Sequence, residues 1–112
     1  MKPKQWDIVW MRVRPTDRDK HPVIILSPDD ILADASTTHI NILYGSTART
    51  GEQRPLRVLL NGSDGLERLT TINCRFIHLV PLANCGEKIG SVSTVRRRQI
   101  SRTLAQSLRL ML

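Results

Sequence analysis

The sequence is poor in cysteine, in aromatic residues and in long hydrophobic runs. Its two cysteines form no Cys-x-x-Cys pair and its three histidines lack zinc-ligand spacing. We therefore expect reduced thiols, no disulfide framework, and neither a metal site nor a cofactor. Aromatic residues make up 4% of the chain, which is too few for the stacking platform of non-specific single-strand binders.

No apolar run approaches the ~18 residues that cross a bilayer. The first residues, MKPKQWD, lack the apolar core of a signal peptide. We therefore expect a soluble, cytoplasmic protein without membrane contact. A length of 112 residues also predicts a single domain, residues 1–112, with one modest core.

Positive charge is in clear excess. The chain has 17 Lys and Arg against 10 Asp and Glu, a net charge of +7 and an isoelectric point near 10.5. Such a balance favours polyanionic partners, because basic side chains neutralise phosphates and release counterions. RNA, DNA and an acidic protein all fit this charge.

Short strands dominate the predicted secondary structure. Apolar and β-branched runs bounded by Pro, Gly and polar clusters predict strands, at residues 6–13, 21–27, 39–47, 56–61, 66–74, 75–81 and 88–93. The GSDG stretch at 62–65 predicts a tight hairpin turn between two of them. One or two helical turns are expected after Pro28.

The hydrophobic period changes to helical from Thr94 onward. Apolar residues then recur at helical spacing, and Ser93 is placed to cap the first turn; they are Val95, Ile100, Leu104, Leu108 and Met111. The arginines between them predict a solvated polar face. Together these elements predict a mainly β fold with a C-terminal helix, a small Src-homology-3-like open barrel.

Several ordered motifs carry a family resemblance. They are WDIVWMRVRPT, HPVIILSP, ILYGST, VLLNGSDGLERLTTINCRFIHLV and KIGSVSTVRRRQISRTLAQSL, and they span about residues 5–110. In this order they resemble the PemK/MazF toxins of bacterial type II toxin–antitoxin modules, which implies a CcdB/PemK-like barrel. The resemblance also implies a homodimer, neutralised by a cognate acidic antitoxin, that meets operator DNA only as the toxin–antitoxin complex.

The resemblance implies a growth-inhibiting endoribonuclease that cuts single-stranded mRNA at short sequences without a metal. In this chemistry the 2′-hydroxyl attacks phosphorus and leaves a 2′,3′-cyclic phosphate and a 5′-hydroxyl. His21 stands where the family usually has a catalytic arginine, and an imidazole can transfer protons near neutral pH. Ser46, or Thr47 if the register shifts by one, matches the second catalytic position, and Lys20 or Arg18 supplies the charge.

Further residues are expected to contact RNA: Lys20, Asn73, Arg75 and Arg49. Asp17 or Asp19 could fill the family's acidic position in the first loop. His39 and His78 are expected to be structural.

Some relatives have Arg-Cys-Asp-Gln where residues 73–76 read NCRF, so an aspartate proposed as their base is absent. Two alternatives therefore remain. One is a CcdB-like DNA gyrase poison, although the chain ends in LML and lacks that family's Trp-Gly-Ile tail. The other is a catalytically decayed relative that binds nucleic acid.

Overall fold

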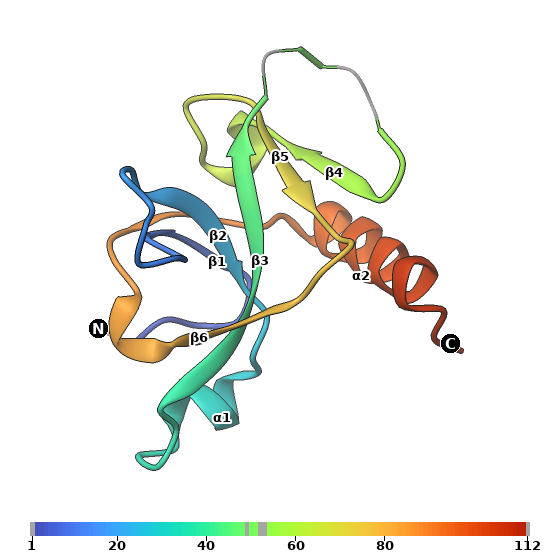
Figure 1. Cartoon of the computed structure of the whole chain (residues 1–112). Coiled ribbons are helices and arrows are strands. Elements are labelled where there is room, and N and C mark those ends of the chain that lie inside the picture. Colours follow the sequence, from blue (N-terminus) through green and yellow to red (C-terminus); the bar gives the residue numbers. More distant parts are fainter. Residues whose placement is uncertain (1, 49, 52–53, 112) are drawn as a thin grey trace.

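A computed structural model describes residues 2–48, 50–51 and 54–111 of the chain. Short strands and one long C-terminal helix make up the described part (Figure 1). The strands are β1 Asp7–Met11, β2 His21–Ile25, β3 His39–Thr47, β4 Arg57–Leu60, β5 Thr70–Asn73, β6 His78–Pro81 and β7 Lys88–Ser91. The helices are α1 Asp29–Ala33 and α2 Thr94–Leu108, with 3₁₀ turns η1 Gly62–Asp64 and η2 Leu82–Asn84.

The strands form one curled antiparallel sheet around β3. Its order is β4-β5-β3-β2-β1-β7, and β6 also pairs with β3. The first half of β3 pairs with β6 and β2, whereas its last residues pair with β5, so β3 runs through the whole sheet (Figure 1). This arrangement confirms the predicted mainly β, open-barrel fold with a C-terminal helix.

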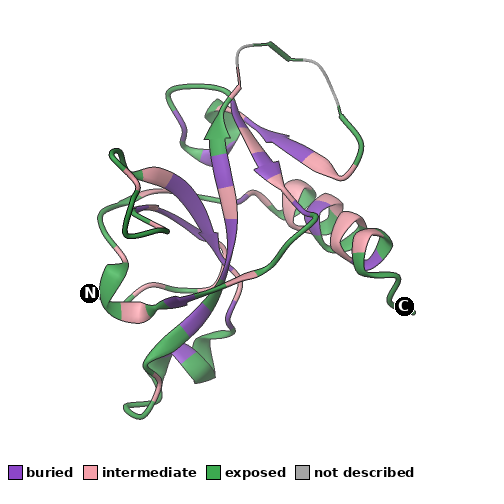
Figure 2. Cartoon of the chain, in the orientation of Figure 1, coloured by how far each residue is buried: buried purple, intermediate pink, exposed green. Residues whose placement is uncertain are grey.

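Two apolar clusters lie on opposite faces of this sheet, and Figure 2 shows in purple that many residues of its strands are buried. Because successive residues of a strand point to opposite faces, Ile42 enters one cluster and Leu43 the other. Helix α2 contacts β4 and buries Ile100 in the Leu43 cluster. Leu32 of α1 lies in the Ile42 cluster. Apolar side chains thus pack against both faces of the sheet.

The predicted tight hairpin turn at 62–65 is wrong. β4 and β5 do pair, with Leu60 opposite Thr70, but β5 starts at Thr70 rather than at Leu66. The connection holds η1, in which the buried carboxylate of Asp64 accepts from the Asn61 N–H at 3.1 Å and from the Ser93 N–H at 2.9 Å. These bonds tie the connection to the start of α2, and Gly65 leaves η1 in the left-handed region at φ 85°.

The C-terminal helix is confirmed, but its apolar face differs from the expected one. Ser93 caps it, since its Oγ accepts from the Arg96 N–H at 3.4 Å. Val95, expected on the buried face, is 72% exposed. It lies five residues before buried Ile100, and at 3.6 residues per turn this spacing puts the two side chains on different sides of the helix. Met111 lies beyond the helix, which ends where Arg109 takes φ 55°, and is 99% exposed.

Every predicted strand except the one at 39–47 is shorter in the structure: β2 ends at Ile25 and β4 covers Arg57–Leu60. β1 ends at Met11, β7 ends at Ser91, and β6 starts at His78 rather than at residue 75. The last difference has a local cause: the Asn73 side chain accepts from the Arg75 N–H at 2.9 Å, which turns the chain between β5 and β6. None of the described helices is long and apolar enough to cross a bilayer.

Candidate active site

Strands β2 and β3 bring His21 and Ser46 to the same face of the sheet. Val23 and Tyr44 are the last paired residues of β2 and β3 on this side, and the same register continued by two residues would place His21 opposite Ser46. The strands still run close together there, because a Cβ on Gly45 would lie 2.6 Å from the Pro22 carbonyl oxygen. Glycine at this position therefore permits the approach that aligns the two polar side chains.

The His21 ring belongs to a cluster of three rings, together with Tyr44 and His78. The centroids of His21 and Tyr44 are 4.8 Å apart, and those of Tyr44 and His78 are 6.0 Å apart. His78, expected to be structural, thus belongs to the same ring cluster through the pairing of β6 with β3. Its sequence position gives no sign of this, because the contact depends on which strands pair.

Asp17 is the carboxylate of the first loop that faces His21. It accepts from the Arg14 N–H at 2.9 Å and the Val13 N–H at 3.1 Å. The bond from Arg14 is the main cause that holds the pKa of Asp17 below its ordinary value, with nearby His21 adding to it. Asp19, the other acidic residue considered, is exposed.

Tyr44 keeps its phenolic proton in this site. Burial raises the pKa of Tyr44 above its ordinary value, and the charge of Asp17 adds to the rise. The hydroxyl is therefore a hydrogen-bond donor or acceptor at neutral pH, and not an anion.

A cationic hollow of about 530 Å³ opens next to Ser46. Two arginines, four hydroxyl-bearing residues and two apolar residues line it: Arg54, Arg57, Ser46, Thr47, Thr50, Thr71, Ala48 and Leu59. Ser46 and Thr71 are direct cross-strand partners between β3 and β5. Arg54 and Arg57 were missed by the sequence reasoning, and only the β4–β5 pairing, with Arg57 opposite Asn73, could have revealed Arg57.

The other predicted RNA contacts are more scattered. Arg18 and Lys20 are exposed in the loop between β1 and β2. Arg75 is exposed, with its guanidinium 5.5 Å from the centre of the Phe76 ring. Asn73 is half-buried at the end of β5. Arg49 lies outside the described residues.

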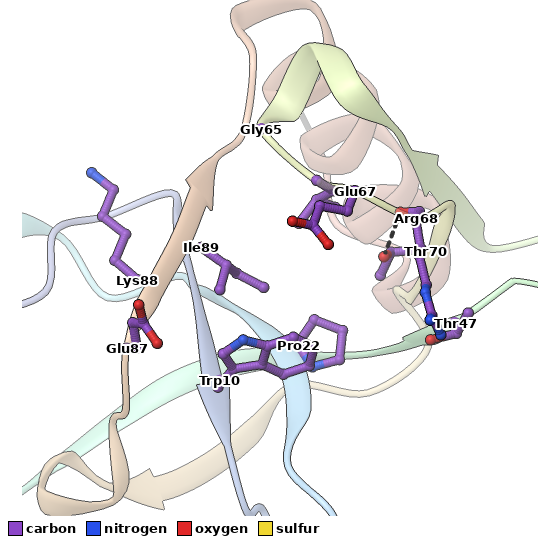
Figure 3. Close-up of a pocket in the computed structure, with 11 residues that line it drawn as sticks. Trp10, Pro22, Thr47, Gly65, Glu67, Arg68, Thr70, Glu87, Lys88 and Ile89 are labelled. Carbon is purple, nitrogen blue, oxygen red and sulfur yellow. Dashed lines mark hydrogen bonds between the residues drawn. The ribbon is translucent and has the colours of Figure 1, made fainter.

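Thr47 also faces a second pocket, of about 500 Å³, on the other side of β3 (Figure 3). This pocket is lined by Trp10, Pro22, Thr47, Gly65, Leu66, Glu67, Arg68, Thr70, Glu87, Lys88 and Ile89. Ser46 is absent from this lining. The two residues considered as alternatives for one catalytic position are therefore not equivalent.

Among the described residues, no group of three or more His, Cys, Asp or Glu side chains is placed to hold a metal ion. The described side chains at the site offer an imidazole, hydroxyl groups, a carboxylate and guanidinium groups.

Residues 4–108 match the family described as the PemK-like, MazF-like toxin of the type II toxin–antitoxin system. The chain belongs to this family. No curated protein sequence matches it closely enough to add to that assignment.

Solved structures of MazF-like toxins share the fold. An endoribonuclease in complex with its cognate antitoxin, from a mycobacterial species, is 20% identical, covers 98% of each chain and gives a TM-score of 0.78. The Mycobacterium tuberculosis toxin MazF-mt6 is 16% identical with a TM-score of 0.77, covering 95% of this chain and 99% of its own. MazE–MazF from Deinococcus radiodurans is 15% identical with a TM-score of 0.77, covering 99% and 100%. At these identities the likeness establishes the fold.

Proposed function

We propose that this PemK/MazF-like chain is a metal-independent endoribonuclease that cleaves single-stranded mRNA at a short sequence and so inhibits growth. The observation that carries the proposal is the pairing of β2 with β3 beside the cationic hollow, because the same register continued by two residues would put His21 opposite Ser46. Family membership and the endoribonucleases among the similar structures support the same reaction class.

The site offers the groups that transesterification of RNA requires. A 2′-hydroxyl attacks the adjacent phosphorus, its proton leaves, and the 5′-oxygen departs with a proton, giving a 2′,3′-cyclic phosphate and a 5′-hydroxyl. We assign proton transfer to His21, which can act as base and then as acid. The Ser46 hydroxyl donates to a non-bridging oxygen, and Arg57 supplies positive charge to the phosphorane.

The loop cations have a supporting role in this proposal. Arg18 and Lys20 extend from the loop just before His21, where they would contact the RNA backbone on either side of the cleaved bond. Asn73 and Arg75 lie at the far end of β5 and would hold the strand farther along.

We further propose that the active toxin is a homodimer. Leu108, Leu110 and Met111 are exposed by 42%, 59% and 99%, which leaves apolar surface at the end of α2 for a second copy. A monomer in light scattering at micromolar concentration would contradict this.

An acidic antitoxin is the expected inhibitor of this chain. Its basic surface, at a net charge of +7, suits an acidic segment that folds on contact. Antitoxin complexes of similar structures support such a partner. Operator DNA would be bound only by the toxin–antitoxin complex. If acidic segments encoded by a neighbouring gene fail to inhibit cleavage, the assignment of an acidic antitoxin as inhibitor is contradicted.

The reaction is tested with purified protein, several unrelated long single-stranded RNAs and a chelator, followed by mapping of the new ends. We expect cuts at a short shared sequence, with 5′-hydroxyl ends and cyclic phosphates. A folded protein that cuts none of these RNAs would refute the enzyme and favour a binding-only relative or a gyrase poison. Inhibition of purified gyrase would then separate these two.

A further inference from the structure

We propose that the pocket over Trp10 binds one guanine base of the RNA, next to the phosphate that is cleaved. This inference rests on the proposed function, because it assigns part of the sequence preference of that reaction. The pocket lies between strands β1 and β2, the connection before β5, and β7 (Figure 3).

The floor of the pocket is an aromatic surface. Trp10 is half-buried and lies beside Pro22 at the bottom of the cavity, and Ile89 closes one side (Figure 3). Single-stranded RNA is recognised by unstacked bases that stack on aromatic side chains and hydrogen-bond through their edges. A volume of about 500 Å³ accommodates one base together with part of its ribose.

The polar rim of the pocket selects the base. Figure 3 shows the Glu67 carboxylate directed into the space above Trp10, while the Arg68 side chain extends toward Thr47. Neither the Glu67 nor the Arg68 side chain bonds to another described residue, and the Arg68 carbonyl accepts from the Thr70 hydroxyl at 3.2 Å. Both charged groups are therefore available to a ligand.

A carboxylate can only accept hydrogen bonds at neutral pH, so its preferred base presents two adjacent donors. Guanine is the base that does so, through N1–H and the N2 amino group on its pairing edge. Arg68 supplies donors for guanine O6 and N7, the acceptors that arginine commonly contacts. Adenine presents one amino donor beside an acceptor, which would face the Glu67 carboxylate unfavourably.

The position of the pocket ties it to the proposed cleavage. Pro22 follows His21 in β2, and Thr47 follows Ser46 in β3. Thr47 also lines both the pocket and the cationic hollow. A nucleotide whose phosphate lies between His21 and Ser46 can thus place its base across the edge of β3 and over Trp10.

Binding of DNA oligonucleotides tests the inference without catalysis, because DNA lacks the attacking 2′-hydroxyl. The probes are labelled nine-residue deoxyuridine chains with one central deoxyguanosine, deoxyadenosine or deoxyinosine, followed by fluorescence anisotropy. Inosine lacks only the N2 amino group of guanine. We expect deoxyguanosine to strengthen binding at least about fivefold over the other two, as one good bidentate base contact gives.

Glu67→Gln should remove most of this preference, since its amide presents a donor to guanine. The matched control is Asp30→Asn, the same chemical change at an exposed carboxylate on α1, which should keep the preference. Equal binding of the three probes by the parent, or an intact preference in Glu67→Gln, would overturn the inference. Guanine preference without RNA cleavage would refute only the proposed function, whereas RNA cleavage without the preference would refute only this pocket.

Discussion

The two sides of the last residues of β3 differ in chemistry. On the Ser46 side, the cationic hollow holds hydroxyl groups and the guanidinium groups of Arg54 and Arg57. On the other side, the pocket over Trp10 has an aromatic floor and carries both the Glu67 carboxylate and the Arg68 cation. One strand therefore separates a surface for phosphate from a pocket with mixed charge.

This difference assigns separate tasks to neighbouring residues. A cationic hollow attracts every phosphate alike and carries no sequence information, whereas base edges are read by directional hydrogen bonds. Changes on the Ser46 side should therefore lower the rate on all RNAs. Changes on the Trp10 side should alter which RNAs are cut.

The largest expected effect is on the Ser46 side, at His21. His21→Ala should lower the cleavage rate by ~10²–10⁴-fold, the usual yield of general acid–base catalysis, with RNA binding nearly unchanged. The control is His39→Ala, an exposed histidine at the start of β3, which should leave the rate as it is. Rates and binding are compared on one mapped RNA.

His21→Arg separates proton transfer from positive charge. Arginine keeps a positive charge but cannot give up its proton, so the arginine variant should lose any pH dependence that proton transfer at this position gives the parent rate. If His21→Arg cleaves as fast as the parent with the same pH profile, His21 acts only through charge or packing. If His21→Ala unfolds the protein, the main role of the histidine is to hold strand β2 in its folded position.

The next effect separates the two neighbours on β3. Ser46→Ala should lower the rate by about 10²-fold, as loss of one donor to a developing oxyanion does. Thr47→Val removes a hydroxyl at nearly constant shape and should change the cleaved sequence more than the rate. A larger rate loss for Thr47→Val than for Ser46→Ala would show that Thr47 holds the phosphate and would reverse the assignment of the two sides.

A smaller effect is expected for the stability of the connection before β5, which supplies Gly65 to Arg68 to the Trp10 pocket. Asp64→Ala leaves the N–H groups of Asn61 and Ser93 without their acceptor, which should cost about 1–3 kcal/mol in urea unfolding. The control Asp34→Ala removes an exposed carboxylate whose hydrogen bonds within the described part of the chain go to Ser36, and it should cost less. Equal losses would show that the buried carboxylate does not hold the connection before β5.

The sequence predicts the elements whose signals are local. The strand 39–47 and helix α2 follow from apolar spacing and from the cap at Ser93, and both have the expected positions. The connection before β5 could not be predicted, because Asp64 meets Ser93 from 29 residues away. Long-range bonds of this kind override the turn preference of GSDG.

The candidate site divides in the same way. His21 and Ser46 stand out through their motifs, and their alignment follows once β2 pairs with β3. The motifs assign no site role to Arg57, His78 or Glu67, because each joins a site only through a strand pairing or a loop path that the linear pattern does not encode.

The smallest expected effect concerns the thiol of Cys74. Its reactivity shows whether a substitution on either side of β3 also opens the packed core beneath the sheet. Cys74 is fully buried in the cluster that contains Leu43, and burial raises the pKa of its thiol to about 11. At pH 8 roughly one thiol in a thousand is then ionised, so Cys74 should resist alkylation in the folded protein. Half-buried Cys85 is replaced by serine in these measurements to leave one thiol.

The same pKa predicts a weak pH dependence of stability. The unfolded thiol of Cys74 releases its proton near 9, whereas the folded one keeps it up to about 11, so the thiol's contribution is complete below pH 9 and falls as pH rises. At pH 10 the loss relative to Cys74→Ala should be on the order of 1 kcal/mol in urea unfolding. Rapid alkylation at pH 8 in Glu67→Gln or Ser46→Ala, but not in their parent, would trace their phenotypes to an opened core and not to two separate sides of β3. Continued protection of Cys74 in both variants, together with their different effects on rate and on sequence preference, would mean that β3 divides phosphate chemistry from base selection without any change in the packing beneath it.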